Sequence, residues 1–126
     1  MRILFIALLC ITSACSMTTK REDAYNYTDH PEFRAAFRKT MDSHKEDFAD
    51  CYREALAMKP DMVGKIVFSW TLNEHGKAQK SSIVSNDTGD DWAANCVLQK
   101  SANWQFPIPP PSQTGTEVRY PLNLAQ

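Results

Sequence analysis

Cysteine and histidine are the residues of this sequence whose types and positions most directly suggest chemistry. His44 precedes Cys51 by seven positions, so on a helix the two side chains would share a face, and a nucleophilic cysteine–histidine pair is conceivable. The alternative is a disulfide between Cys51 and Cys96, which a domain exported to an oxidising compartment favours. We favour the disulfide, because Cys96 supplies a partner and the two cysteines lack the close spacing of a redox motif.

Metal binding and acid–base catalysis find little support in the other titratable residues. The three histidines, His30, His44 and His75, do not share metal-ligand spacing, and a zinc site with two cysteines would need two of them close by. The carboxylates of Glu46-Asp47 and Asp90-Asp91 are adjacent in sequence, so each pair points apart, and acids are favoured at helix N-termini in any case. The sequence also lacks a nucleophile elbow, a phosphate-binding loop and an HExxH motif. We therefore expect no catalytic residues, no metal and no cofactor.

The first fourteen residues have the layout of a secretory signal peptide. Arg2 is followed by an apolar run over residues 3–11 and by small residues at positions 12–14. The apolar run is shorter than the about 20 residues that span a bilayer. A buried first element of the fold is the alternative, but the polar residues that follow offer it no sheet or helix to join. We expect export to the periplasm and removal of residues 1–14.

Cys15 is the expected site of a lipid anchor. The stretch Ser13-Ala14-Cys15-Ser16 resembles a bacterial lipoprotein signal, in which a small residue precedes a cysteine that is acylated and becomes the new N-terminus. Several acyl chains would anchor the domain firmly, since each buried methylene contributes about 0.8 kcal/mol. Ser16 directly after the cysteine favours the outer membrane. An ordinary signal peptide cut near Ala14 remains the alternative.

Length and charge limit the number of domains and the classes of partner. The 126 residues include 14 basic and 15 acidic side chains, a net charge of −1, so nucleic acid is not an expected partner. Residues 15–28 are polar and form an expected tether. Residues 29–126 suffice for one domain.

A long amphipathic helix is expected at the start of this domain. Residues 29–32, Asp-His-Pro-Glu, combine a cap, a first-turn proline and a capping-box acid. Apolar residues then recur every three or four positions, and Pro60 ends the helix near Met58. A second capping box at residues 43–46 predicts a break within it.

A second helix is expected from Asp91 to about Asn103, with Thr88 or Asp90 as its cap. Helical spacing places Cys96 on its buried face and Cys51 on the buried face of the first helix, so a disulfide would join the two helices. After it the chain turns extended, because the apolar residues Trp104, Phe106 and Ile108 alternate. The two large rings, of Trp104 and Phe106, are expected in the core.

Three strands complete the predicted order. Residues 65–72 alternate between apolar and polar, and the turn after them ends at Gly76, which tolerates a positive φ. Residues 77–85 form a second strand with a broken alternation, which predicts a bulge or an exposed face. Residues 116–124 alternate as a last strand, where Pro121 indicates an edge. The order α-β-β-α-β predicts a two-layer α+β fold with a three-stranded antiparallel sheet and helices on one face.

From residue 51 to residue 124 the sequence resembles the C-terminal domain of TonB-like proteins, and more closely the AgmX/PglI C-terminal variety known from gliding bacteria. The matching residues are Cys51-Tyr52, Ala55-Leu56, Pro60, 64–68, Gly76, 83–85, Cys96-Val97, 104–107 and 118–121. The resemblance implies a domain that binds proteins or peptides in the periplasm, often by pairing strands with a partner. It implies no catalytic residues, and it suggests a motility or transport complex as the setting.

We therefore expect a non-catalytic interaction module of the cell envelope, anchored by its lipid. The candidate partner-binding edge is the last strand, with Val118, Tyr120 and Leu122, and Trp92 is the candidate exposed aromatic residue. The same edge is a candidate for strand-mediated dimerisation. Alternatively, Arg119 and Pro121 protect a solvated edge. A small lipoprotein inhibitor of a hydrolase is the alternative function, and an enzyme that uses Cys51 is a third.

Overall fold

The computed structural model describes residues 30–110 and 115–125. The expected signal peptide, the lipid site at Cys15, the polar tether and the proposed cap at Asp29 lie outside the described residues.

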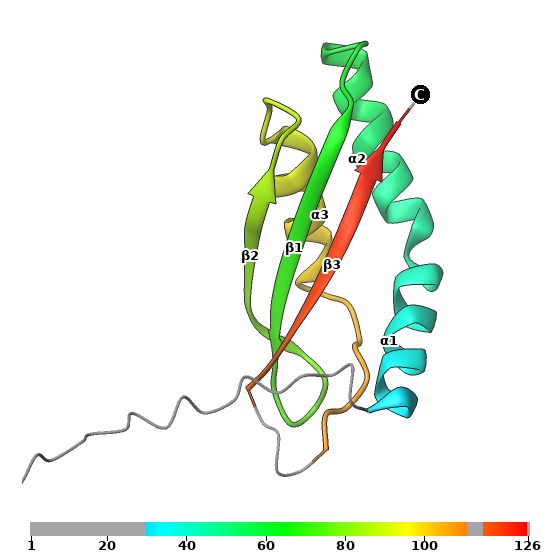
Figure 1. Cartoon of the computed structure of the whole chain (residues 1–126), viewed down its shortest axis with the longest axis vertical. Helices are drawn as coiled ribbons and strands as arrows, with labels where there is room; N and C mark the ends of the chain where they lie inside the picture. The colour runs from blue at the N-terminus through cyan, green and yellow to red at the C-terminus, as the bar shows by residue number, and fades with distance from the viewer. Residues whose placement is uncertain (1–29, 111–114, 126) are drawn as a thin grey trace, which may run out of the picture.

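The predicted order of elements is confirmed, with the first helix divided in two (Figure 1). The described elements, in chain order, are α1 (Pro31–Ser43), α2 (Lys45–Met58), β1 (Gly64–Leu72), β2 (Ala78–Asn86), α3 (Trp92–Ser101) and β3 (Thr116–Leu124).

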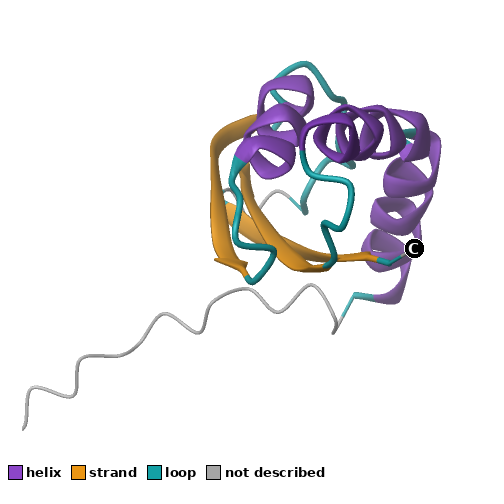
Figure 2. Ribbon diagram, turned by 90° about the horizontal axis from the view of Figure 1, so that it is seen from above, coloured by secondary structure: helices purple, strands orange, loops and turns teal. Residues whose placement is uncertain are grey.

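The three strands form one antiparallel sheet in the order β2-β1-β3. The view along the long axis shows the helices together on one side of this curved sheet (Figure 2). The predicted two-layer α+β fold is therefore confirmed. Because β1 is central, β2 and β3 are the two edges of the sheet.

The break in the first helix falls where the sequence predicts it, at His44 between α1 and α2. The capping box expected there is wrong. The Ser43 hydroxyl donates instead to the carbonyl of Thr40 at 2.7 Å, and neither helix has a side-chain cap at its N-terminus. Serine side chains compete in this way for backbone groups close in sequence. The predicted helix end at Met58 is confirmed.

The start of α3 uses both predicted capping residues, but neither occupies the N-cap position. Asp91 precedes the helix and makes no side-chain cap bond. Asp90 accepts the backbone N–H of Trp92 at 2.7 Å, and the Thr88 hydroxyl donates to the Asp90 carbonyl at 2.8 Å. The helix ends at Ser101, two residues earlier than predicted.

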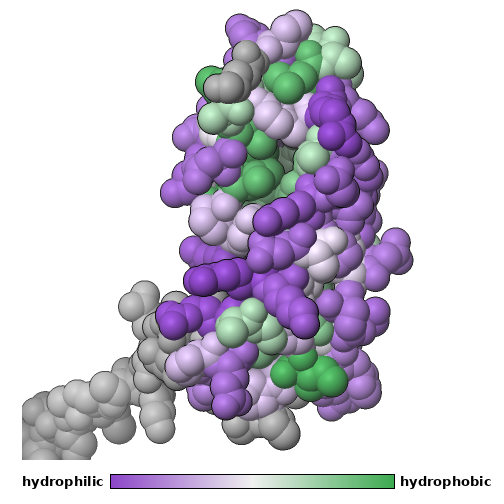
Figure 3. All heavy atoms as spheres, turned by 90° about the vertical axis from the view of Figure 1, so that its right-hand side faces the viewer, coloured by the Kyte–Doolittle hydropathy of each residue, from purple (hydrophilic) through white to green (hydrophobic). Residues whose placement is uncertain are grey.

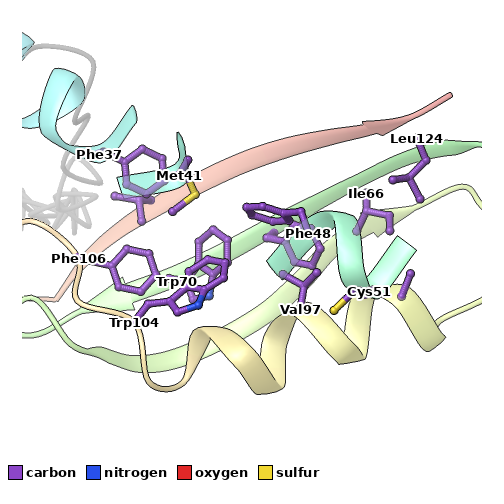
Figure 4. Close-up of a cluster of buried hydrophobic side chains, with 14 of the residues drawn as sticks. Phe37, Met41, Phe48, Cys51, Ile66, Trp70, Val97, Trp104, Phe106 and Leu124 are labelled. Atoms are coloured by element: carbon purple, nitrogen blue, oxygen red, sulfur yellow. The ribbon is translucent and has the colours of Figure 1, made fainter. Parts of the chain in front are cut away.

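The core lies between the helices and the inner face of the sheet and is rich in aromatic rings (Figure 4). Trp104 and Phe106 are buried as predicted, and their ring centroids lie 5.9 Å and 5.4 Å from that of Trp70 on β1. Ile108, the next alternate residue, is 66% exposed, because the chain leaves the core at the proline cluster. The stretch after α3 therefore supplies two core residues from outside any helix or strand.

Gly76 attaches the hairpin turn to this stretch. Its φ is +71°, as the sequence predicts, and its carbonyl accepts the backbone N–H of Phe106 at 2.9 Å. A Cβ at position 76 would lie 2.3 Å from the carbonyl oxygen of Phe106. Only glycine therefore fits both the conformation and the close approach.

Candidate interaction site at the edge of the sheet

The predicted disulfide is present and joins α2 to α3. Cys51 and Cys96 are bonded with their Cα atoms 5.7 Å apart, and Cys51 is 1% exposed. A structural bridge of this kind favours an oxidising compartment. A bonded Cys51 has no thiol to offer His44, so the cysteine–histidine pair that the spacing allowed is not formed.

His44 takes part in a different cluster, centred on the carboxylate of Asp47. Asp47 Oδ2 lies 2.9 Å from His44 Nδ1 and accepts the indole N–H of Trp104 at 3.0 Å. The His44 ring stacks on the Trp104 ring with centroids 4.1 Å apart, and Lys100 Nζ lies 3.9 Å from Asp47 Oδ1. The cluster fastens the junction of α1 and α2 to the segment after α3. Its geometry is that of a structural lock.

Among residues 30–110 and 115–125, no group of three or more histidine, cysteine, aspartate or glutamate side chains is placed to hold a metal ion. None of the helices in these ranges has the length and apolar character needed to cross a membrane.

The two edges of the sheet differ in regularity. Against β2, β1 has two register shifts, and one of them leaves Val84 as an extra residue between the pairs Val67↔Ser85 and Phe68↔Ile83. The bulge predicted for the second strand is thus confirmed. Against β3, β1 pairs without interruption from Gly64↔Leu124 to Leu72↔Thr116. Bulges are a common device for protecting an edge, so β3 is the better template for an added strand.

The outward backbone groups of β3 follow from the hydrogen bonds of β1. Lys65 accepts from Asp87, next to β2, and Leu72 accepts from Gly115, next to β3. Backbone groups alternate in direction along a strand, so the odd residues of β1 face β2 and the even residues face β3. In the register of β3, its even residues bond to β1 and its odd residues direct N–H and C=O away from the sheet.

Pro121 is one of these outward-facing residues, together with Glu117 and Asn123. Its missing N–H therefore costs no bond to β1, which explains how a proline is accommodated within a regular strand. It does remove one outward donor near the middle of the edge, so Pro121 protects the edge in part.

The side chains of the predicted edge residues point toward the helical layer. Val118 is fully buried in the core, whereas Tyr120 and Leu122 are partly buried and pack against it. What β3 offers to a partner at the edge of the sheet is thus its backbone N–H and C=O groups, and not these side chains. Trp92 is 38% exposed but belongs to α3, so the structure does not bring it together with the other predicted site residues on β3.

A groove between α1 and β3, which sequence reasoning missed, accompanies this edge. It encloses about 220 Å³ and is lined by four residues of α1 and three of β3: Arg34, Phe37, Arg38, Met41, Arg119, Tyr120 and Pro121. Phe37 and Met41 are buried and form an apolar floor with Tyr120. Figure 3 shows the side of the molecule on which α1 lies, where hydrophilic side chains border apolar ones. We call this hollow the α1–β3 groove.

One of the arginines that line the groove, Arg119, is paired with a carboxylate. Glu117 accepts hydrogen bonds from Arg119 Nε at 2.9 Å and from the Ser69 hydroxyl at 2.8 Å. These bonds, that of Arg119 first, lower the pKa of Glu117 below its ordinary value. Within the part of the chain that the structure describes, Arg34 and Arg38 have no ion-pair partner. The groove thus carries an excess of positive charge.

The fold and this site together define a disulfide-bridged, two-layer α+β domain with one regular edge strand and a basic, apolar-floored groove beside it. No family model, no curated protein and no solved structure matches the chain.

Proposed function

We propose that the chain is a non-catalytic interaction module that binds an extended segment of an envelope protein or peptide as an added strand along β3. The observation that carries the proposal is the uninterrupted pairing of β1 with β3, which leaves a regular outer edge with outward backbone groups. In this mode of recognition the main chain contributes affinity and pockets for alternate side chains contribute specificity. The resemblance to TonB-like C-terminal domains agrees with it.

The disulfide also supports a binding function over catalysis. The cysteine with the most chemical promise, Cys51, is held in a buried bridge and not as a reactive thiol. The cluster around Asp47 has its polar atoms directed at Trp104 and His44. Cys51, His44 and Asp47 thus each have a structural role.

The proposed location is the periplasm, with the chain held to the outer membrane by a lipid on Cys15. Intact-mass measurement of the protein purified from membranes tests this directly. We expect a chain that begins at Cys15 and carries acyl groups, and we expect Cys15→Ser to release the protein from the membrane fraction. An unmodified chain cut near residue 14 would support an ordinary signal peptide and rule out the anchor.

Strand addition is tested with a nine-residue synthetic peptide, matched to the length of β3, in which threonine alternates with valine. Two versions carry N-methyl groups on alternate amides, one set at odd positions and the other at even positions. Because only every second amide of an added strand faces β3, one version should lose binding to the full chain and the other should retain it. Equal binding of the two versions, measured by fluorescence polarisation, would rule out strand pairing.

The protein side is tested by Asn123→Pro. Position 123 faces outward, so proline removes an outward donor and leaves the bonds to β1 in place. Asn123→Ala is the matched control, since it removes the same side chain and keeps the N–H. We expect the proline variant alone to weaken peptide binding.

A further inference from the structure

We infer that the α1–β3 groove selects acidic partners: it receives an apolar side chain of the bound strand, while Arg34 and Arg38 pair with acidic residues on either side of that anchor. This inference deepens the proposed strand addition and rests on it. The partner is a protein segment of stated chemistry, an extended acidic peptide with one apolar anchor.

The floor of the groove fits an apolar anchor. Phe37 is 4% exposed, Met41 is 2% exposed, and the ring of Tyr120 meets that of Phe37 edge-on with centroids 6.5 Å apart. The hollow of about 220 Å³ is smaller than the roughly 300–1,000 Å³ of small-molecule sites. A single inserted side chain is therefore the occupant that its size and lining favour.

The rim of the groove determines the charge of the partner. Arg34 and Arg38 are four residues apart on α1, so they lie one above the other on the same flank of the helix. Both line the groove, and neither is neutralised by a carboxylate among the described residues. Guanidinium groups bind carboxylates with two parallel hydrogen bonds, which favours glutamate or aspartate over other polar residues. This local excess of arginine contrasts with the chain's overall net charge of −1.

The geometry of an added strand brings the anchor and the acids to the same side. Side chains alternate between the two faces of a strand, so residues at positions i−2, i and i+2 of the partner all face the helical layer. An apolar residue at i then enters the groove, and acids at i−2 and i+2 reach the flank of α1. Arg119 also borders the groove, but its guanidinium is already engaged with Glu117.

The anchor residue also sets the register of the bound strand, because it enters the groove beside Pro121. This proline lines the groove and lacks the N–H that an added strand would use at that point of the edge. The partner therefore loses a backbone hydrogen bond beside the place where its side chain is captured. The groove thus determines the register in which the partner lies along β3.

The test compares two fluorescent nine-residue peptides in which every second residue is threonine. Three successive positions of the other face read Glu-Leu-Glu in one peptide and Lys-Leu-Lys in the other, so the two differ only at the residues that flank the leucine. Fluorescence polarisation with the full chain should show at least about tenfold tighter binding of the acidic peptide, and added salt should reduce the difference. The double variant Arg34→Glu/Arg38→Glu should reverse the preference. Lys39→Glu is the matched control, because it changes the charge of α1 outside the groove and should leave the preference intact.

The outcomes separate this inference from the proposed function. Equal binding of the two peptides, or a preference that the double variant does not alter, overturns the acidic groove even where strand addition holds. If the preference for the acidic peptide persists in both N-methylated versions, at odd and at even positions, the groove is supported and strand pairing is ruled out. Absence of binding by both peptides overturns the inference. A dimer of the chain through β3 that the acidic peptide does not dissociate also overturns it, since the occupant is then a second copy.

Discussion

The indole N–H of Trp70, in the middle of β1, donates a hydrogen bond of 2.9 Å to the hydroxyl of Ser101, in the last turn of α3. Both residues are completely buried. The same hydroxyl donates to the carbonyl of Leu98 at 2.8 Å, so each polar group of the pair has a partner. This contact fastens the sheet to the helical layer with a specific direction, which apolar packing alone does not supply.

Ser101→Ala should destabilise the domain by about 1–3 kcal/mol, because it leaves the Trp70 N–H buried without an acceptor. Urea denaturation followed by tryptophan fluorescence measures the change. Ser81→Ala, at an exposed position of β2, is the control and should stay within about 0.5 kcal/mol of the wild type. Equal effects of the two substitutions would contradict the role assigned to Ser101.

Asp47 offers a second test of a polar contact, since its carboxylate meets His44, Trp104 and Lys100. Asp47→Ala removes every one of these contacts and should cost about 1.5–3 kcal/mol, the range for hydrogen bonds to a charged group. Asp47→Asn keeps an oxygen that accepts the Trp104 N–H and should therefore cost less. The two variants are compared by urea denaturation at neutral pH, and a larger loss in the asparagine variant would rule out the proposed lock.

The disulfide is expected to contribute much of the stability of the domain. It closes a sequence separation of 45 residues, for which the chain-entropy model gives about 4 kcal/mol. Cys96→Ser, or reduction of the native protein, should lower the free energy of unfolding by about that amount, while apolar packing keeps the fold in place at low denaturant. Alkylation followed by peptide mapping should label Cys51 and Cys96 only after reduction. Labelling of Cys51 in the untreated protein would restore the thiol hypothesis.

The elements predicted correctly depend on signals that are local in the sequence. Alternation marks β1, Pro60 ends α2, and Gly76 marks the turn of the hairpin, and each acts within a few residues of its position. The disulfide was predictable by counting. Of the four cysteines, Cys10 lies in the proposed signal peptide and Cys15 is the proposed lipid site, which leaves Cys51 and Cys96 as a pair. The edge position of β3 was predictable from Pro121, because a proline is excluded from the interior of a sheet.

The features that were missed depend on contacts between distant residues. Trp104 and Asp47 are 57 residues apart, and the α1–β3 groove joins Arg34 to Arg119. Periodicity identifies which face of a helix is apolar, but it does not indicate which strand lies beside its flank. The errors at helix ends have another cause. Ser and Asp favour the N-cap position, but the side chains of Ser43 and Asp90 bond to neighbouring backbone groups without occupying that position.

Glu117 should make a small contribution to stability that depends on pH. Its pKa is lowered in the folded state by the hydrogen bond from Arg119, and next by that from Ser69, so the ionised carboxylate stabilises the fold. This contribution is present above the ordinary pKa of 4.5 and is lost as the pH falls through the lower folded value.

Glu117→Gln should therefore reduce stability at neutral pH and match the wild type at strongly acidic pH. The side chain is 42% exposed, which limits the difference to at most about 1 kcal/mol. Glu54→Gln, which removes a carboxylate that makes no ion pair with the described residues, is the control and should show no such dependence. Urea midpoints measured across the acidic range decide the matter, and a Glu117→Gln difference that persists when the carboxylate is protonated would assign the effect to packing and not to charge.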